Sequence, residues 1–93
     1  MKRQRHFDAS ETVLREVAQI RNMIVDLDRS IQILDCDVAN EEQRARVSDR
    51  SDPAYPILAR ALAARRDNLR DTIAALEQRL ATIKVPVVEA VAV

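Results

Sequence analysis

The fold is decided by residues 13–38, which read VLREVAQIRNMIVDLDRSIQILDCDV. Apolar residues recur there in alternating steps of four and three, the spacing that puts side chains on one face of a helix. The period of 3.5 residues predicts a coiled-coil-like helix that packs against a second helix along its length. The face consists of successive apolar positions: Val13, Val17, Ile20, Ile24, Leu27, Ile31, Leu34 and Val38.

The composition of the whole chain favours an all-α fold. Of its 93 residues 47% are hydrophobic and 32% are charged, which is enough apolar surface for one folded domain and is not typical of a disordered chain. Glycine is absent and proline occurs three times. Folds that need many tight turns are disfavoured, because the chain has no residue that adopts positive φ angles without steric cost.

The first helix is predicted over residues 8–48. Asp8 and Glu11 have the spacing of a capping box, with Ser10 as the competing N-cap. Residues 1–7 are predicted to form a short basic tail. No apolar run follows this tail, so we expect no secretory signal and a cytoplasmic location.

Two prolines mark the end of this helix and the start of the next. Pro53 and Pro56 cannot both lie deep within one helix. We therefore predict a loop over residues 49–55 and a second helix over residues 56–84, with Pro56 as its first residue. The alternative start has Asp52 as the N-cap and Pro53 as the first residue, which would cost a hydrogen bond at Pro56.

The second helix carries its own apolar ridge, interrupted by Arg65 and Arg66. Pro86 bounds this helix and leaves an apolar tail over residues 85–93. Two ridges of similar character predict that the helices pack against each other. The second ridge comprises Leu58, Leu62, Leu69, Ile73, Leu76, Leu80 and Ile83.

A short connection between two such helices predicts an antiparallel two-helix hairpin. The charges agree, since residues 8–43 hold nine acidic and three basic side chains, whereas residues 44–70 hold seven basic and three acidic ones. A chain folded about residue 52 sets these blocks side by side. Asp35 is predicted to approach Arg70. Glu41 or Glu42 is expected near one of three further bases: Arg60, Arg65 and Arg66.

The predicted helices differ in length, at about 57 Å and about 43 Å, so the start of the first helix extends past the second. Three apolar residues there, Val13, Leu14 and Val17, lack a partner from the second helix, and either the tail over residues 85–93 or another chain is expected to cover them. A weaker apolar strip lies off the main ridge. Pairing of two hairpins into a homodimeric four-helix bundle covers both regions. The alternative is a monomer with scattered apolar residues on its surface. The residues predicted to self-associate are Val13, Leu14, Val17, Val25, Ile33 and Cys36.

The residues of common catalytic and cofactor sites are scarce, so we expect no enzyme, no cofactor and no metal site. His6 is the only histidine and lies in the predicted tail, which leaves no obvious histidine base. The lack of glycine excludes the usual phosphate-binding loops. Cys36, the only cysteine, is interpreted as a small apolar residue, with a redox thiol or an intersubunit disulfide as alternatives.

The arginines around the loop are a candidate basic tip for phosphate groups. Acidic residues lie among them, and only Phe7 and Tyr55 are aromatic, so a base-stacking surface is not expected. We therefore predict a non-catalytic protein–protein interaction or adaptor module without membrane contact, and keep a nucleic-acid-binding regulator as the alternative. The arginines of this predicted tip are Arg44, Arg46, Arg50, Arg60, Arg65 and Arg66.

Overall fold

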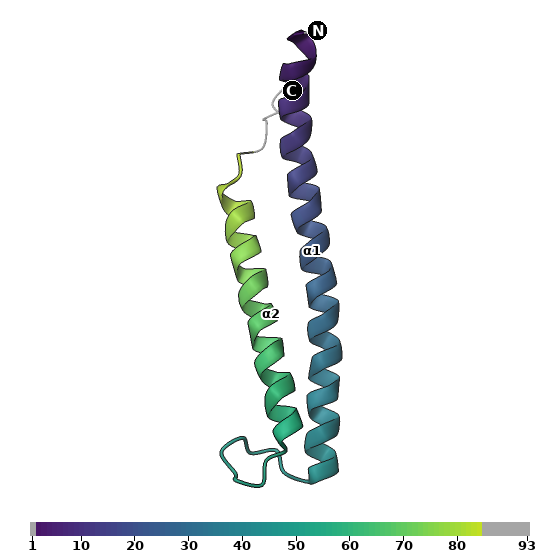
Figure 1. The fold of residues 1–93 in the computed structure, drawn as a ribbon, viewed down its shortest axis with the longest axis vertical. Helices are drawn as coiled ribbons and strands as arrows, with labels where there is room; N and C mark the ends of the chain where they lie inside the picture. Colours follow the sequence, from purple (N-terminus) through teal and green to yellow (C-terminus); the bar gives the residue numbers. More distant parts are fainter. Residues whose placement is uncertain (1, 85–93) are drawn as a thin grey trace, which may run out of the picture.

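The chain is a two-helix hairpin in a computed structural model that describes the backbone of residues 2–84 and the side chains of residues 10–84. The helices are α1 (Lys2–Ala45) and α2 (Ile57–Thr82), and no strand occurs in this part of the chain. They lie side by side and run antiparallel (Figure 1). The predicted all-α hairpin is confirmed. The tail predicted over residues 85–93 lies outside the described residues.

Both ends of α1 differ from the prediction. Residues 2–7, expected as a tail, are already helical, so the helix does not begin at Asp8. Lysine, arginine and glutamine, which dominate this segment, are good helix formers. At the other end α1 stops at Ala45, before the predicted residue 48, because Arg46 adopts a φ of 60°.

A Schellman motif ends α1. The amide of Arg46 donates to the carbonyl of Gln43 at 3.2 Å, and the amide of Val47 donates to the carbonyl of Glu42 at 3.2 Å. Glycine is the usual residue at the left-handed position of this motif. The chain has none, so Arg46 occupies the position at a cost of about 1–2 kcal/mol.

Two successive turns built on aspartates reverse the chain. The Asp49 carboxylate accepts hydrogen bonds from the hydroxyl and the amide of Ser51, at 2.7 and 2.9 Å, and these bonds lower the pKa of Asp49. The Asp52 carboxylate accepts from the amide of Ala54 at 2.8 Å, and its carbonyl accepts from the amide of Tyr55 at 2.9 Å. Aspartate side chains thus stabilise a reversal of the chain direction for which glycine is the usual residue.

The start of α2 follows the first of the two predicted alternatives. Pro53 lies inside the second turn, so the helix does not start there. Pro56 is the N-cap and its carbonyl accepts from the amide of Arg60 at 3.1 Å, which places the start of the helix one residue later than predicted. α2 ends at Thr82, two residues before the predicted end.

The apolar face of α1 supplies most of the buried surface. Its buried side chains all belong to the predicted pattern, which confirms that this face packs against α2. The tightest packing is a cluster beside the connection, which we call the tip cluster: Val38, Tyr55, Ala59 and Ala63. Both alanines are 0% exposed, because small side chains let the two helices approach closely. The buried residues of α1 are Val17, Ile20, Ile31, Leu34 and Val38.

The hairpin is a single layer of two helices. Its principal extents are 66 × 29 × 17 Å. The smallest extent leaves room for only one helix with its side chains, since a helix is about 10–12 Å across. Each of the two broad faces of the hairpin is therefore open to solvent.

Candidate functional site

An arginine–aspartate network links the two helices near their middle. Asp35 accepts a hydrogen bond from Arg66 at 3.0 Å and lies 3.6 Å from Arg70, while Asp67 contacts both arginines. The hydrogen bond with Asp35 raises the pKa of Arg66. The predicted approach of Asp35 to Arg70 is confirmed. The Arg66 side chain is only 16% exposed, so the arginine that interrupts the α2 ridge binds α1.

A second ion pair shows which residues of the two helices lie side by side at the far end. Arg79 donates two hydrogen bonds to Glu16, at 2.7 and 3.1 Å. α2 therefore covers Val17, which is 7% exposed, and the prediction that Val17 lacks a partner from the second helix is wrong. The connection folds back along α1 before α2 begins, since the Tyr55 hydroxyl donates to Glu42 at 2.7 Å. This displaces α2 towards the start of α1.

The six arginines of the predicted tip do not form one free basic surface. Arg66 belongs to the interhelical network, and Arg44 pairs with Glu41 on its own helix. Arg60 lies over the ring of Tyr55, 5.3 Å from its centroid. Half of the predicted phosphate-binding set is thus already engaged within the hairpin.

The other three arginines of this set are exposed, two in the connection and one on α2. Arg46 begins the connection directly after α1 ends at Ala45, and Arg50 lies further along it, where its carbonyl accepts a hydrogen bond from Arg60 at 3.1 Å. Arg65 lies on α2 and makes no ion pair with another residue of the described region.

The acidic residues at the end of α1 do not make the predicted pairs. Glu41 or Glu42 was expected beside an arginine of α2, but Glu41 pairs with Arg44. Glu42 accepts the hydrogen bond of the Tyr55 hydroxyl, and this bond raises the pKa of Tyr55 above its ordinary value of 10.0. No ion pair between Glu41 or Glu42 and an arginine of α2 occurs in the described residues, although Arg60 lies over the ring of the Tyr55 that Glu42 holds.

The residues predicted to self-associate are exposed to different degrees. Val13 is half-buried, while Leu14 is 47% exposed. Val25 and Ile33 are 53% and 57% exposed, and Cys36 is also exposed. These last three lie off the buried ridge of α1, and polar residues such as Arg29 and Gln32 separate Val25 from Ile33. We call Val25, Ile33 and Cys36 the outer strip.

Exposed apolar side chains also occur at positions that the sequence analysis did not single out for self-association. Met23 of α1 and Leu58 of α2 are 49% and 52% exposed, and Ile57 is 83% exposed. A helical wheel places Met23 beside the main ridge, but it does not give the exposed fraction of the Met23 side chain. The large ridge residues of α2 other than Leu58 are all half-buried: Leu62, Leu69, Ile73, Leu76, Leu80 and Ile83.

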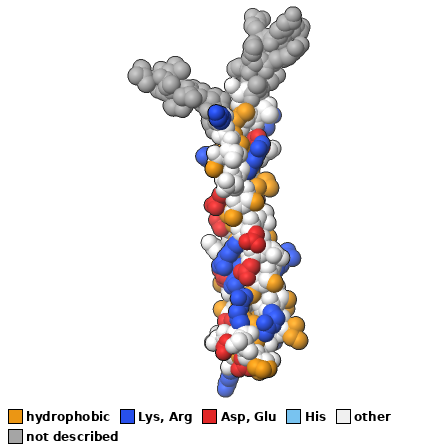
Figure 2. Space-filling model, turned by 90° about the vertical axis from the view of Figure 1, so that its left-hand side faces the viewer, with side chains coloured by type: hydrophobic (Ala, Val, Ile, Leu, Met, Phe, Trp, Pro, Cys, Tyr) orange, Lys and Arg blue, Asp and Glu red, His pale blue; other side chains and the backbone are white. Residues whose placement is uncertain are grey.

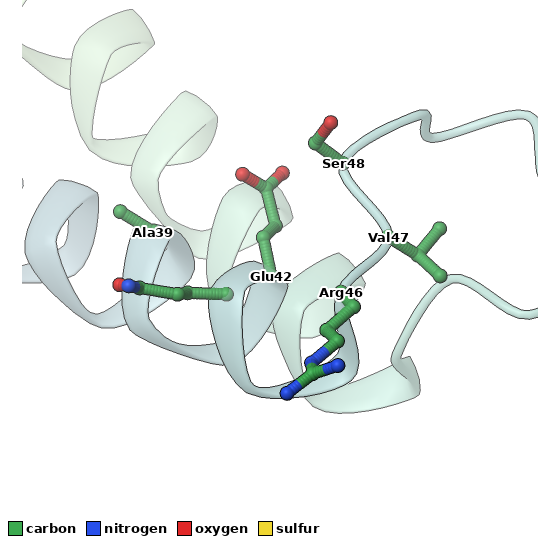
Figure 3. Close-up of a pocket in the computed structure, with 6 residues that line it drawn as sticks. Ala39, Glu42, Arg46, Val47 and Ser48 are labelled. Carbon is green, nitrogen blue, oxygen red and sulfur yellow. The ribbon is translucent and has the colours of Figure 1, made fainter.

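A shallow pocket of about 480 Å³ lies at the junction of α1 and the connection (Figure 3). Its one acidic group, Glu42, is held by Tyr55, and Arg46 stands at its edge. The pocket is open to solvent and holds no buried polar group that lacks a partner. It is lined by Ala39, Glu42, Gln43, Arg46, Val47 and Ser48.

Within the described residues, no group of three or more His, Cys, Asp or Glu side chains is placed to hold a metal ion. Neither α1 nor α2 contains a stretch long and apolar enough to cross a bilayer. Comparisons of the chain with protein-family models, with curated proteins and with solved structures find no match. The arguments about function therefore rest on the geometry of the hairpin.

Proposed function

We propose that the chain is a non-catalytic protein–protein interaction module that associates with a second copy of itself into a homodimeric four-helix bundle. The observation that carries this proposal is the single-layer architecture, only 17 Å thick. A helix pair buries one stripe of each helix, whereas stable domains bury apolar side chains between at least two layers. A second hairpin supplies the missing layer.

The apolar ridge of α2 supports the same proposal. No large ridge residue of α2 is fully buried, whereas α1 buries much of its own ridge against it. Removing apolar surface from water stabilises an assembly by about 25 cal/mol per Å². Partly exposed leucines along a whole helix therefore favour association, and a closed pair of identical subunits is the simplest assembly that covers them.

Nucleic-acid binding is the weaker function, because half of the predicted basic tip is engaged. Arg66 is held by Asp35, Arg44 by Glu41, and Arg60 lies over Tyr55. Phosphate binding would have to compete with these contacts, and of the remaining arginines two lie in the connection and one lies on α2.

The proposal is tested by sedimentation equilibrium of the full chain between low and high micromolar concentration, with thermal melts by circular dichroism over the same range. We expect twice the mass of the chain and a melting temperature that rises with concentration, because association stabilises the folded state by mass action. A single-chain mass with a melting temperature independent of concentration would overturn the proposal. Affinity for oligonucleotides that falls steeply with salt, without dimer formation, would favour the alternative.

A further inference from the structure

The two broad faces of the hairpin can be told apart by their ion pairs. At 100° per residue, Glu16 and Asp35 lie on opposite sides of the α1 ridge, so their ion pairs with α2 lie on opposite faces. Steps of seven residues keep side chains on one face. We call the face marked by Glu16 and Arg79 the open face. It also carries Met23, Ser30 and Asp37 of α1, and Leu58, Arg65 and Thr72 of α2.

The open face is the more apolar of the two. Met23 and Leu58 are about half exposed on it, at 49% and 52%. The column of α2 residues beside it is apolar at every heptad step and half-buried throughout: Leu62, Leu69, Leu76 and Ile83.

The opposite face, which carries the Asp35 network, is more polar. The corresponding α2 column is Ala59, Arg66, Ile73 and Leu80, so one arginine interrupts it, and the α1 column on that side is charged at Arg21, Asp28 and Asp35. Figure 2 views the hairpin edge-on from the side of α2, and acidic and basic side chains interleave along this edge. A second layer therefore buries more apolar surface if it covers the open face.

Two charged residues on the open face are without an ion pair in the described part of the chain and lie at the same level along the long axis of the hairpin. Asp37 and Arg65 are exposed, and neither makes an ion pair with any residue of the described part of the chain. Their near neighbours in sequence, Asp35 and Arg66, are hydrogen-bonded across the hairpin. Asp37 and Arg65 are therefore at the same level along the long axis.

We infer that the second copy packs on the open face with both connections at the same end of the bundle. This inference rests on the proposed function. A twofold axis along the bundle puts α1 of each copy over α2 of the other, so Asp37 meets Arg65 of the partner subunit, and the partner's Asp37 meets Arg65. The opposite orientation, with the connections at different ends, places α1 over α1 and forms neither pair. The self-complementary charges select a second copy as the occupant.

The face is tested with charge substitutions at matched exposure. Met23→Glu and Leu58→Glu on the open face are expected to give a helical monomer by sedimentation equilibrium and circular dichroism. Val25→Glu and Ile33→Glu on the outer strip have similar exposure and are expected to leave the dimer intact. Dissociation by the outer-strip variants, with a dimer retained by the open-face variants, would overturn the inference while the proposed function stood. A wild-type chain that is monomeric throughout would overturn both.

The orientation is tested by charge reversal. Asp37→Arg and Arg65→Asp are each expected to raise the dissociation constant about five- to tenfold, because each breaks two symmetric ion pairs. The double variant restores opposite charges and is expected to return the constant close to that of the wild type. Additive losses in the double variant would contradict the pairing.

A distance measurement gives an independent test of orientation. In a Cys36→Ser background, a spin label at Ser48→Cys reports the separation of the two connections. We expect a distance between labels much shorter than the 66 Å length of the hairpin. A distance close to that length would mean that the connections lie at opposite ends, and the inferred orientation would be wrong.

Discussion

The two ends of α2 are packed in different ways, although α1 is buried at both, with Val17 and Ile20 only 7% and 6% exposed at the far end. Near the connection, the tip cluster places two alanines of α2 against Val38, and both are completely buried. Further along, α2 presents leucine and isoleucine, and these larger side chains are only partly buried. The ribbons lie closest at the connection and diverge towards the other end (Figure 1). Small residues let two helices seal an interface, whereas large ones hold the helices apart and leave apolar surface for a further layer.

The largest effect expected from this difference comes from placing one charge at each end. Val38→Asp puts a carboxylate at a position that is 6% exposed and is expected to destabilise the hairpin by more than about 3 kcal/mol. Leu76→Asp, in the half-buried ridge, is expected to lower stability much less, because its carboxylate can reach water. Urea unfolding followed by circular dichroism measures both. Equal losses would mean that the two ends are packed alike.

A smaller effect is expected from the residue that ends α1. Arg46→Gly is expected to raise the free energy of unfolding by about 0.5–1 kcal/mol, because glycine adopts a φ of 60° without the steric cost borne by arginine. Gln43→Gly, two residues inside the helix, is the control and is expected to lower it by about 1 kcal/mol. If both variants lost stability, the motif at Arg46 would not contribute as the geometry indicates.

The smallest effect concerns the titration of Tyr55. Its hydroxyl donates to Glu42, and this bond raises its pKa above the ordinary 10.0. Because the folded state favours the neutral phenol, the stabilisation is complete below pH 10 and is lost as pH rises through the raised pKa. Tyr55 is the only tyrosine and tryptophan is absent, so ultraviolet absorbance reports this group alone. We expect Glu42→Gln to move the pKa back towards 10.0, and an unchanged titration would contradict the contact.

The architecture could be predicted from the sequence because it depends on periodicity and on residues that break helices. The eight-position apolar face of α1 requires a partner helix, and Pro53 and Pro56 exclude one continuous helix. The approach of Asp35 to Arg70 followed from the charge pattern. These features act over many residues or through strong steric rules, so local detail does not alter them.

Register and connection could not be predicted in the same way. The position of α2 depends on the Tyr55 contact with Glu42 and on the turns at Asp49 and Asp52, and these bonds displaced α2 far enough to cover Val17. The Asp-x-Ser spacing at residue 49 and Asp-Pro at residue 52 are turn signals that the sequence does contain. The left-handed Arg46 gives no such signal, since arginine is not a residue that favours positive φ.

The order of contacts along the hairpin has a consequence for how the molecule assembles and comes apart. The Tyr55–Glu42 bond joins residues 13 apart in sequence, whereas Arg79 and Glu16 are 63 apart. Closing a short stretch of chain costs less entropy than closing a long one. We therefore expect the helices to join at the turn first and zip outward, and to separate from the opposite end. The end of the helix pair beside the connection is therefore its most stable part, and the opposite end is the last to pack together.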